Sequence, residues 1–179
     1  MESLIINPGI RIEEEEDYNR ITEVNNLAFN QTNEGIIISK LRKTDKFIPG
    51  LLLEAELHKK IVGHILFYPL DIISGVKRSE ILSLAPIAVL PEFQRKGIGK
   101  KLVIQGLKKS EALGFKAVVV SGHPEYYPKF GFERASKWNI KPPIDDVPDA
   151  ASTASELEDG FLKDNAGFIE YPAEYYQAL

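Results

Sequence analysis

The chain has 179 residues, 44% of them hydrophobic, a length that fits one compact domain over 1–179 with a real core rather than two. Its formal net charge is −4, and acidic and basic residues are interspersed, which argues against nucleic acid or an anionic membrane as the partner. The absence of cysteine excludes disulfides, thiolate metal sites and a covalent cysteine intermediate. The N-terminus lacks a signal-peptide pattern and no run of about 20 apolar residues occurs, so we expect a cytoplasmic protein with a small-molecule partner.

The first half of the chain predicts a strand, two helices and a β-hairpin. The expected elements are a strand at 10–12, a helix from Asp17 onward, a helix over 34–41, and strands over 51–57 and 61–68. Asp17 is a favourable N-cap residue for the first helix. The apolar face of that helix comprises Ile21, Val24, Leu27 and Ala28. Polar residues 58–60 between two apolar runs indicate the hairpin turn.

The middle of the chain changes from strand to helix and back to strand. An apolar run over 81–90, interrupted by Pro86, predicts a strand. Apolar residues recur at helical spacing after Gly97 and predict a helix that ends at Gly114. The β-branched run 117–121 then predicts a strand buried on both faces and parallel to the earlier one. This order of elements indicates a mixed α/β fold.

The C-terminal third predicts less regular structure. A short helix over 125–130 is expected to end at Gly131. Residues 141–165, which begin with a stretch rich in proline, alanine and serine, are expected to form a mobile loop. Residues 167–171 are expected to return as an edge strand.

The segment between the strand at 81–90 and the next helix has the features of a phosphate-binding turn. Free N–H groups and the positive end of the helix dipole favour an anion at a helix N-terminus, and glycine lets the backbone approach it closely. Gly97 and Gly99 supply the glycines, and Arg95 and Lys96 add positive charge. The spacing fits neither a Walker loop nor the dinucleotide-binding fingerprint. A surface turn without a ligand is the alternative.

Gln94, Gly97 and Gly99 match the pattern Q/R-x-x-G-x-G/A, and together with the flanking strand and helix they resemble the GNAT superfamily of N-acetyltransferases. The resemblance implies a GNAT fold, with a central twisted mixed sheet of about six to seven strands and flanking helices, splayed between the strands at 81–90 and 117–121. It implies acetyl-CoA or CoA as co-substrate. The residues implied to bind it are Ile87, Ala88, Val89, Gln94, Arg95, Lys96, Gly97, Ile98, Gly99 and Lys100. Pro86 agrees with a bulge next to the splay, or simply marks an edge.

The segment 122–132 carries a second feature of that family, a tyrosine four residues before a Gly-Phe pair. Here Tyr127 precedes Gly131 and Phe132. The resemblance implies that Tyr127 is the general acid that protonates the CoA thiolate. A core tyrosine with its hydroxyl bonded to backbone is the alternative. Together with residues 84–89, the segment resembles the YhbS-like branch of predicted N-acetyltransferases.

The remaining chemistry is less well marked. Glu80 resembles the position of the base in some relatives, and a solvated acid at a strand end explains it equally well. His123 is either a base near the substrate or a strand-end residue, and we favour the latter. The three histidines lack metal-ligand spacing, so we expect no metal.

The expected activity is direct transfer of an acetyl group from acetyl-CoA to a primary amine of a small molecule or peptide. The alternative is a module that binds or senses acyl-CoA without catalysis. A homodimer is common in such relatives, and nothing in the sequence decides the oligomeric state.

Overall fold

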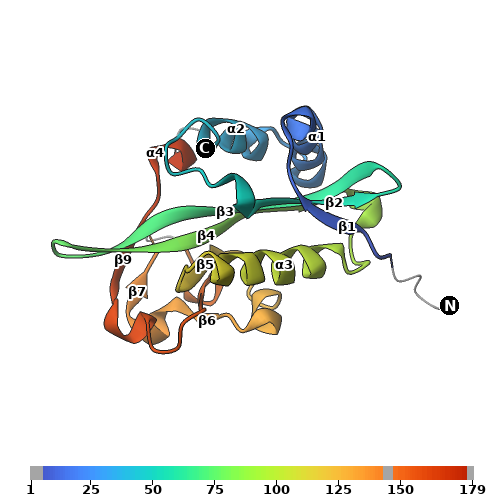
Figure 1. Ribbon diagram of the computed structural model, residues 1–179. Coiled ribbons are helices and arrows are strands. Elements are labelled where there is room, and N and C mark those ends of the chain that lie inside the picture. The colour runs from blue at the N-terminus through green and yellow to red at the C-terminus, as the bar shows by residue number, and fades with distance from the viewer. Residues whose placement is uncertain (1–5, 143–146, 177–179) are drawn as a thin grey trace. The chain divides into compact units, whose positions relative to one another are not determined.

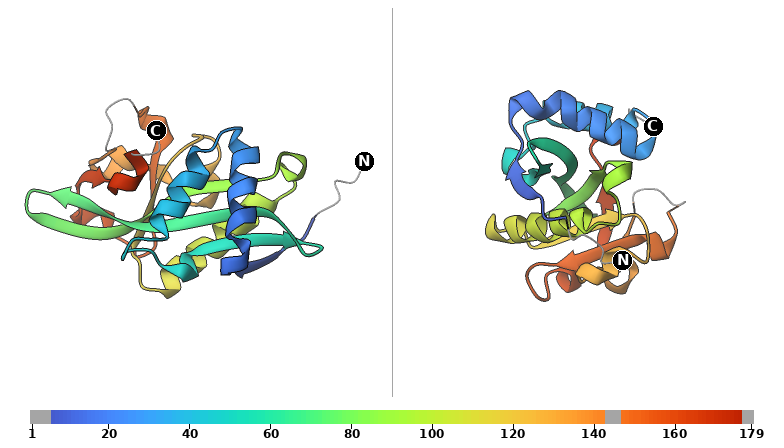
Figure 2. Two further views of the ribbon diagram at one scale, coloured as in Figure 1. Left: turned by 90° about the horizontal axis from the view of Figure 1, so that it is seen from above. Right: turned by 90° about the vertical axis from the view of Figure 1, so that its right-hand side faces the viewer.

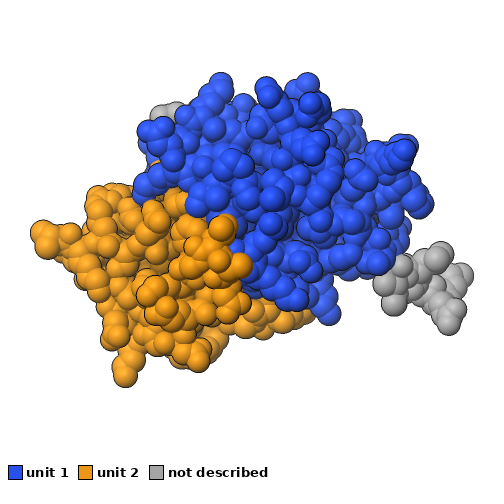
Figure 3. All heavy atoms as spheres, in the orientation of Figure 1, with its two compact units in different colours: residues 1–67, 86–109, 173–179 blue, residues 68–85, 110–172 orange. Residues whose placement is uncertain are grey.

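The computed structural model describes residues 6–142 and 147–176. The chain divides into two compact units, which Figure 3 colours separately. Unit 1 comprises residues 1–67, 86–109 and 173–179, and unit 2 comprises residues 68–85 and 110–172. The chain passes between the units several times, and two long strands and one helix contribute residues to both. Whether the two units together form the single domain expected over 1–179 stays a prediction.

Unit 1 is built on antiparallel strands. β1 (Gly9–Ile12) pairs with β2 (Leu52–Leu57), and β2 pairs with the first part of β3 (Lys60–Ser74). β2 and β3 form the predicted hairpin, but their turn comprises two residues rather than the expected 58–60, because β3 already begins at Lys60. His58 and Lys59 in this turn have φ angles of 49° and 63°, the left-handed conformation that a tight hairpin requires.

Helices cover both faces of the unit 1 strands (Figures 1 and 2). α1 (Tyr18–Phe29) and α2 (Asn33–Leu41) lie side by side on one face, and α3 (Ile98–Ala112) lies on the other. The short α4 (Ala173–Tyr176) contacts α2. Three 3₁₀ turns precede α1, β2 and α3, at Glu15–Asp17, Pro49–Leu51 and Pro91–Phe93.

The buried face of α1 differs in part from the prediction. α1 follows Asp17 as expected, and Ile21 and Val24 are fully buried. Leu27, which was expected on the buried face, is 51% exposed, whereas Asn25, which was not expected there, is fully buried. The helix therefore turns the i, i+3, i+4 positions that start at Ile21 toward the strands, and a polar residue enters the interior.

Gly106 of α3 lies directly against Phe67 of β3. A Cβ atom at position 106 would fall 2.1 Å from Phe67 Cε2, and the Phe67 side chain is fully buried. We expect Gly106→Ala to lower the free energy of unfolding by about 1–3 kcal/mol, the usual cost of overpacking a core. Thermal unfolding measures the change, and adding Phe67→Leu should restore part of it. An unchanged melting temperature for Gly106→Ala would show that the helix shifts without cost.

Unit 2 combines parallel and antiparallel strands. β5 (Ala117–Ser121) pairs in parallel with β4 (Lys77–Val89) and antiparallel with β8 (Ser152–Glu156), and β8 also pairs with β6 (Glu133–Arg134). β9 (Gly167–Glu170) pairs with the second part of β3 and with β7. β7 spans Ile140–Lys141, and 3₁₀ turns span Tyr127–Phe130, Ala135–Trp138, Asp149–Ala151 and Leu162–Asp164. The core of this unit comprises Leu70, Ile72, Ile81, Ala117, Val119, Ala135, Ile140, Ala154, Leu162 and Ile169.

The mixed α/β class is confirmed, but three expectations about the sheet are wrong. Among the described residues nine strands take part, rather than six to seven. Residues 152–156 of the loop expected over 141–165 form β8, which pairs with both β5 and β6. This segment has no apolar alternation, so its strand conformation comes from its neighbours. β9 pairs with two strands instead of forming an edge. Residues 143–146 lie outside the described residues.

The helix expected over 125–130 is instead a 3₁₀ turn, Tyr127–Phe130. Pro128 lacks the N–H that a longer helix would use, which explains the difference. Gly131 ends the turn with a φ of 87°, as a C-terminal glycine should. No helix within residues 6–142 and 147–176 has both the length and the apolar character needed to cross a membrane.

Candidate functional site

The turn between β4 and α3 contains two left-handed residues. After the 3₁₀ turn at 91–93, Gln94 returns to an extended conformation, and α3 begins at Ile98. Arg95 and Gly97 have φ angles of 58° and 88°. The left-handed conformation costs a residue with a Cβ atom about 1–2 kcal/mol, which glycine avoids. Changes of handedness between neighbours turn N–H groups toward one side, as in anion-binding nests.

The space in front of this turn is open. A Cβ atom at Gly97 would meet no atom within 4 Å, and the side chains of Arg95, Lys96 and Lys100 are exposed. The first N–H groups of α3 have no acceptor within the helix, and the helix dipole adds partial positive charge there. The turn therefore fits a pyrophosphate, which supplies both negative charge and acceptor oxygens.

One hydrogen bond and one close backbone approach place the turn against the strands of unit 1. Gln94 Nε2 donates a hydrogen bond to the Val89 carbonyl at 3.0 Å, so this side chain reaches back to the end of β4. A Cβ atom at Gly63 of β3 would lie 3.0 Å from the Ala88 carbonyl oxygen and 3.3 Å from Ile98 Cγ2. Glycine at position 63 thus lets the strand end and the helix start approach β3 closely.

The end of β4 alternates between buried and accessible side chains. Ala88 is 3% exposed, while Ile87 and Val89 are half-buried. Among the described residues the parallel ladder with β5 contains two residue pairs, and the last of them joins Ser83 to Val119. The ladder stops before either strand ends. This break agrees with the splay expected between the two strands.

Tyr127 lies in an aromatic cluster of unit 2. It is 7% exposed, and its ring packs edge to face against Tyr126 and Phe132, with centroid distances of 5.2 and 5.6 Å. Burial raises the pKa of its hydroxyl to about 12. A Cβ atom at Gly122 would lie 2.7 Å from Tyr127 Cε2, so this glycine makes room for the ring. Within the described parts of the chain the hydroxyl makes no hydrogen bond.

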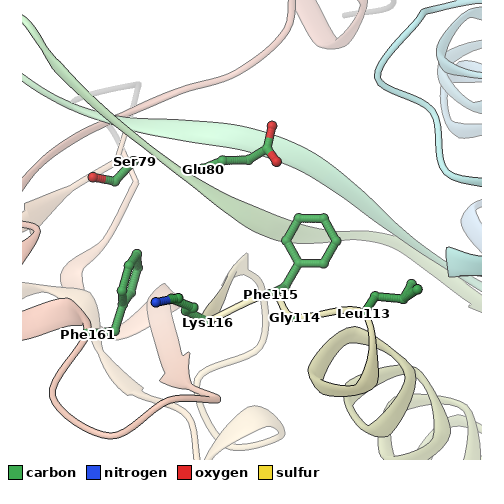
Figure 4. Close-up of a pocket in the computed structure, with 7 residues that line it drawn as sticks. All are labelled: Ser79, Glu80, Leu113, Gly114, Phe115, Lys116 and Phe161. Atoms are coloured by element: carbon green, nitrogen blue, oxygen red, sulfur yellow. The ribbon is translucent and has the colours of Figure 1, made fainter.

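Glu80 lies apart from Tyr127. It is exposed and lines a cavity of about 340 Å³ together with Phe115 and Lys116, which lie just before β5 (Figure 4). Gly122, which contacts Tyr127, follows the other end of β5. The two predicted catalytic residues are therefore associated with opposite ends of β5, a strand of five residues that spans roughly 13 Å at about 3.3 Å per residue. The structure does not bring them together.

The residues that complete the site were not evident from the sequence. A glycine at a strand end, such as Gly122, signals a close approach but not which side chain approaches. Gly63 gives the same weak signal within a strand. Nothing in the sequence predicts the left-handed backbone conformation of Arg95, because arginine does not favour that conformation. His123 is exposed, and its carbonyl accepts the Tyr126 N–H at 3.1 Å.

The strand, the left-handed glycine turn and the helix of unit 1 form an arrangement that favours an anion at a helix N-terminus. Residues 13–132 match the Acetyltransferase (GNAT) family. The matched segment contains both the turn at Gly97 and Tyr127. The chain belongs to the GNAT family of acetyltransferases.

Relatives from bacteria agree with this membership. The uncharacterized N-acetyltransferase YjhQ of Escherichia coli K12 is 35% identical over 122 residues, 68% of this chain and 67% of that protein. The uncharacterized N-acetyltransferase YhbS of the same strain is 28% identical over 162 residues, 90% of this chain and 95% of that protein. These relatives support the YhbS-like resemblance.

Two solved structures of GNAT proteins share the fold. The crystal structure of Escherichia coli YhbS in complex with CoA has a TM-score of 0.87 at 26% identity, over 96% of this chain and 93% of that one. A GNAT acetyltransferase from Brucella melitensis in complex with acetyl-CoA has a TM-score of 0.76 at 28% identity, over 94% and 98%.

Proposed function

We propose that this protein transfers an acetyl group from acetyl-CoA directly to a primary amine of a small molecule or peptide. The observation that carries the proposal is the open, left-handed glycine turn at the start of α3, which offers N–H groups and cations to a pyrophosphate. Structural relatives that contain CoA or acetyl-CoA support the choice of ligand. Family membership supplies the reaction class, and the amine acceptor is our inference.

The cofactor site that we propose runs from the end of β4 through the turn. Pyrophosphate oxygens would accept hydrogen bonds from the N–H groups of residues 97–100, and Arg95 and Lys96 would add positive charge. The pantetheine amides would pair with the backbone of residues 87–89, since β4 has left its ladder with β5 before this point. Gln94 would keep the turn in place through its bond to β4.

The transfer requires no covalent enzyme intermediate, and the chain has no cysteine to form one. The neutral amine attacks the thioester carbonyl, the bond to the CoA sulfur breaks, and the nitrogen releases one proton to solvent, from which the proton donor to the sulfur is restored. We propose that the Tyr127 hydroxyl donates the proton that the leaving thiolate takes up. A pKa of about 12 keeps this hydroxyl protonated at physiological pH. A thiol in water has a pKa of roughly 8.5. Burial raises the pKa of a thiol for the same reason as that of a tyrosine hydroxyl, so a buried CoA thiolate takes up a proton more readily than one in water.

Two side chains are candidates for the base that deprotonates the incoming ammonium. Glu80 is our candidate, although its place at the other end of β5 from Tyr127 would call for a chain of water molecules. His123 is exposed and precedes Tyr127 on the same segment. We expect the variant that lacks the true base to lose the acidic limb of the pH–rate profile of kcat/KM. Profiles of Glu80→Gln and His123→Asn therefore decide between them.

Thermal unfolding with added acetyl-CoA or CoA tests the cofactor site. A ligand that binds only the folded protein stabilises it, by about 2.7 kcal/mol at 100 times its Kd. We expect a saturable rise in melting temperature with both ligands, followed by thiol release and an acetylated product with at least one primary amine. No rise at millimolar ligand would remove the cofactor proposal. Binding without transfer would favour the non-catalytic acyl-CoA module.

Gly122→Ala should misplace Tyr127 without removing it. The added methyl group would press on the phenol ring from 2.7 Å, and a displacement of about 1 Å can cost up to 100-fold in rate. We expect kcat to fall by about tenfold or more, with the KM for acetyl-CoA unchanged. If kcat stays at the wild-type value, the position of the phenol does not limit the reaction.

A further inference from the structure

Arg11 of β1 lies among three carboxyl groups of unit 1. Its guanidinium donates two hydrogen bonds to Asp17, with N–O distances of 2.8 and 3.2 Å. Its Nη2 atom lies 2.5 Å from Glu54 Oε1, and its Nε atom lies 3.5 Å from Glu56 Oε2. One positive charge therefore faces three groups that are each negative when ionised.

Glu54 is the most deeply buried of the three acids. Its side chain is 0% exposed, compared with 14% for Asp17 and 36% for Glu56. Arg11 Nη2 lies close to Glu54 Oε1, but among the described residues neither oxygen of Glu54 accepts a hydrogen bond of regular geometry. An ionised carboxylate without donors is costly inside a protein, and such a group takes up a proton instead.

The side chain that faces Glu54 from β3, and the α1 residue behind it, are both uncharged. His64 of β3 lies opposite Glu54, and burial lowers its pKa to about 3, so the ring is neutral. Asn25 of α1, whose Nδ2 lies 3.1 Å from His64 Nδ1, is uncharged. Arg42 beyond α2 is occupied by Glu13, with N–O distances of 3.1 and 2.5 Å.

We propose that Glu54 keeps its proton at neutral pH and donates it to Asp17, so that a carboxyl pair joins β2 to the start of α1 and responds to pH. Asp17 is the ionised partner, because it accepts hydrogen bonds from Arg11 and from the Glu14 backbone N–H at 2.9 Å. The shared proton removes one of the negative charges around Arg11.

The electrostatics of the two acids agree with this assignment. Burial raises the pKa of Glu54 to about 8, because it outweighs the opposing effect of the Arg11 charge, and the neighbouring Asp17 carboxylate acts in the same direction as burial. The hydrogen bonds from Arg11, with a smaller contribution from Glu54, lower the pKa of Asp17. The two pKa values therefore move apart, as expected for a pair that holds one proton.

These shifts fix the direction of the pH effect. In the unfolded chain Glu54 loses its proton near its ordinary pKa of 4.5, whereas the folded protein keeps it until about pH 8. Between these values the folded state binds more protons, so its stability falls as the pH rises. Above about pH 8 the folded protein loses the proton as well, and two adjacent carboxylates then repel each other.

Asp17, the ionised member of the carboxyl pair, borders a cavity of about 430 Å³ in unit 1. Arg11, Asp17 and Glu56 line it, together with Arg20 of α1 and Lys60 of β3. Asp17 is the N-cap residue of α1 and is partly exposed, so it is the partner that can move when the pair ionises. Loss of the proton should loosen the first turn of α1 and make the cavity wall more negative.

An NMR titration of side-chain carboxyl carbons in the full chain tests the proposal, with amide exchange of residues 14–22 measured over the same pH range. We expect one glutamate carboxyl to titrate near pH 8, and exchange corrected for its intrinsic rate to rise several-fold through that midpoint. Glu54→Gln can still donate to Asp17, so it should remove both effects. Glu56→Gln faces the same guanidinium from a more exposed position and should keep both.

A Glu54 carboxyl that titrates near the ordinary glutamate pKa would overturn the proposal. So would a Glu54→Gln protein whose amide exchange keeps the wild-type dependence on pH. If Glu54→Gln does not fold, Asp17→Asn serves instead. That change removes the neighbouring charge and frees Arg11 for Glu54, so the Glu54 midpoint should fall by about one unit or more, and an unchanged midpoint contradicts the pair.

Discussion

Tyr127→Phe should lower kcat by about 10²- to 10⁴-fold, the usual contribution of a general acid. The affinity for acetyl-CoA should stay unchanged, because the ring still fills the aromatic cluster beside Tyr126 and Phe132. Stability should change little, since the hydroxyl makes no hydrogen bond to any described residue. Steady-state kinetics together with a binding titration separate these effects.

The matched control is Tyr126→Phe. Tyr126 is adjacent in sequence and packs against the same ring at a centroid distance of 5.2 Å. We expect this variant to keep kcat within a few-fold of the wild type. Equal losses in both variants would indicate that the cluster is needed for packing only. A Tyr127→Phe enzyme that turns over at the wild-type rate would remove Tyr127 from the reaction.

Gly97→Ala should weaken acetyl-CoA binding by about 10- to 100-fold. Alanine at a φ of 88° is strained by about 1–2 kcal/mol, and each 1.4 kcal/mol is tenfold in affinity. Relief of this strain would turn the N–H groups away from the phosphate. The methyl group would also occupy the open space in front of the turn, where no protein atom lies within 4 Å.

Gly114→Ala is the control for backbone strain. Gly114 has a φ of 87° and, like Gly97, no atom within 4 Å of a Cβ atom built on it. Both variants should lose similar thermal stability, but only Gly97→Ala should lose affinity for acetyl-CoA in a calorimetric titration. Equal affinities in the two variants would show that the turn is structural and that CoA binds elsewhere.

The regular elements of the fold were predictable because each has its own periodicity. The hairpin around His58, the strand at 81–90 and the helix after Gly97 all carry a clear apolar pattern. β8 could not be found in this way, because Ser152–Glu156 contains small and polar residues that pair with β5 and β6. Such a strand is set by its neighbours rather than by its own residues.

The candidate site likewise has features that a local sequence pattern predicts and features that depend on neighbouring elements. The glycine spacing indicates the phosphate turn, and the segment around Tyr127 indicates the acid. The sequence does not show that Glu54 is fully buried while Glu56, two residues later, is partly exposed. That difference depends on how α1 and β1 cover β2. The roles assigned to Tyr127 and Glu80 stay predictions, as do a cytoplasmic location and a homodimer.

A crystal structure of the protein with CoA tests the central claim most directly. We predict the pyrophosphate against the N–H groups of residues 97–100, the pantetheine along residues 87–89, and the sulfur within hydrogen-bonding reach of the Tyr127 hydroxyl. A pyrophosphate bound away from this turn, or a sulfur out of reach of Tyr127, would contradict the account.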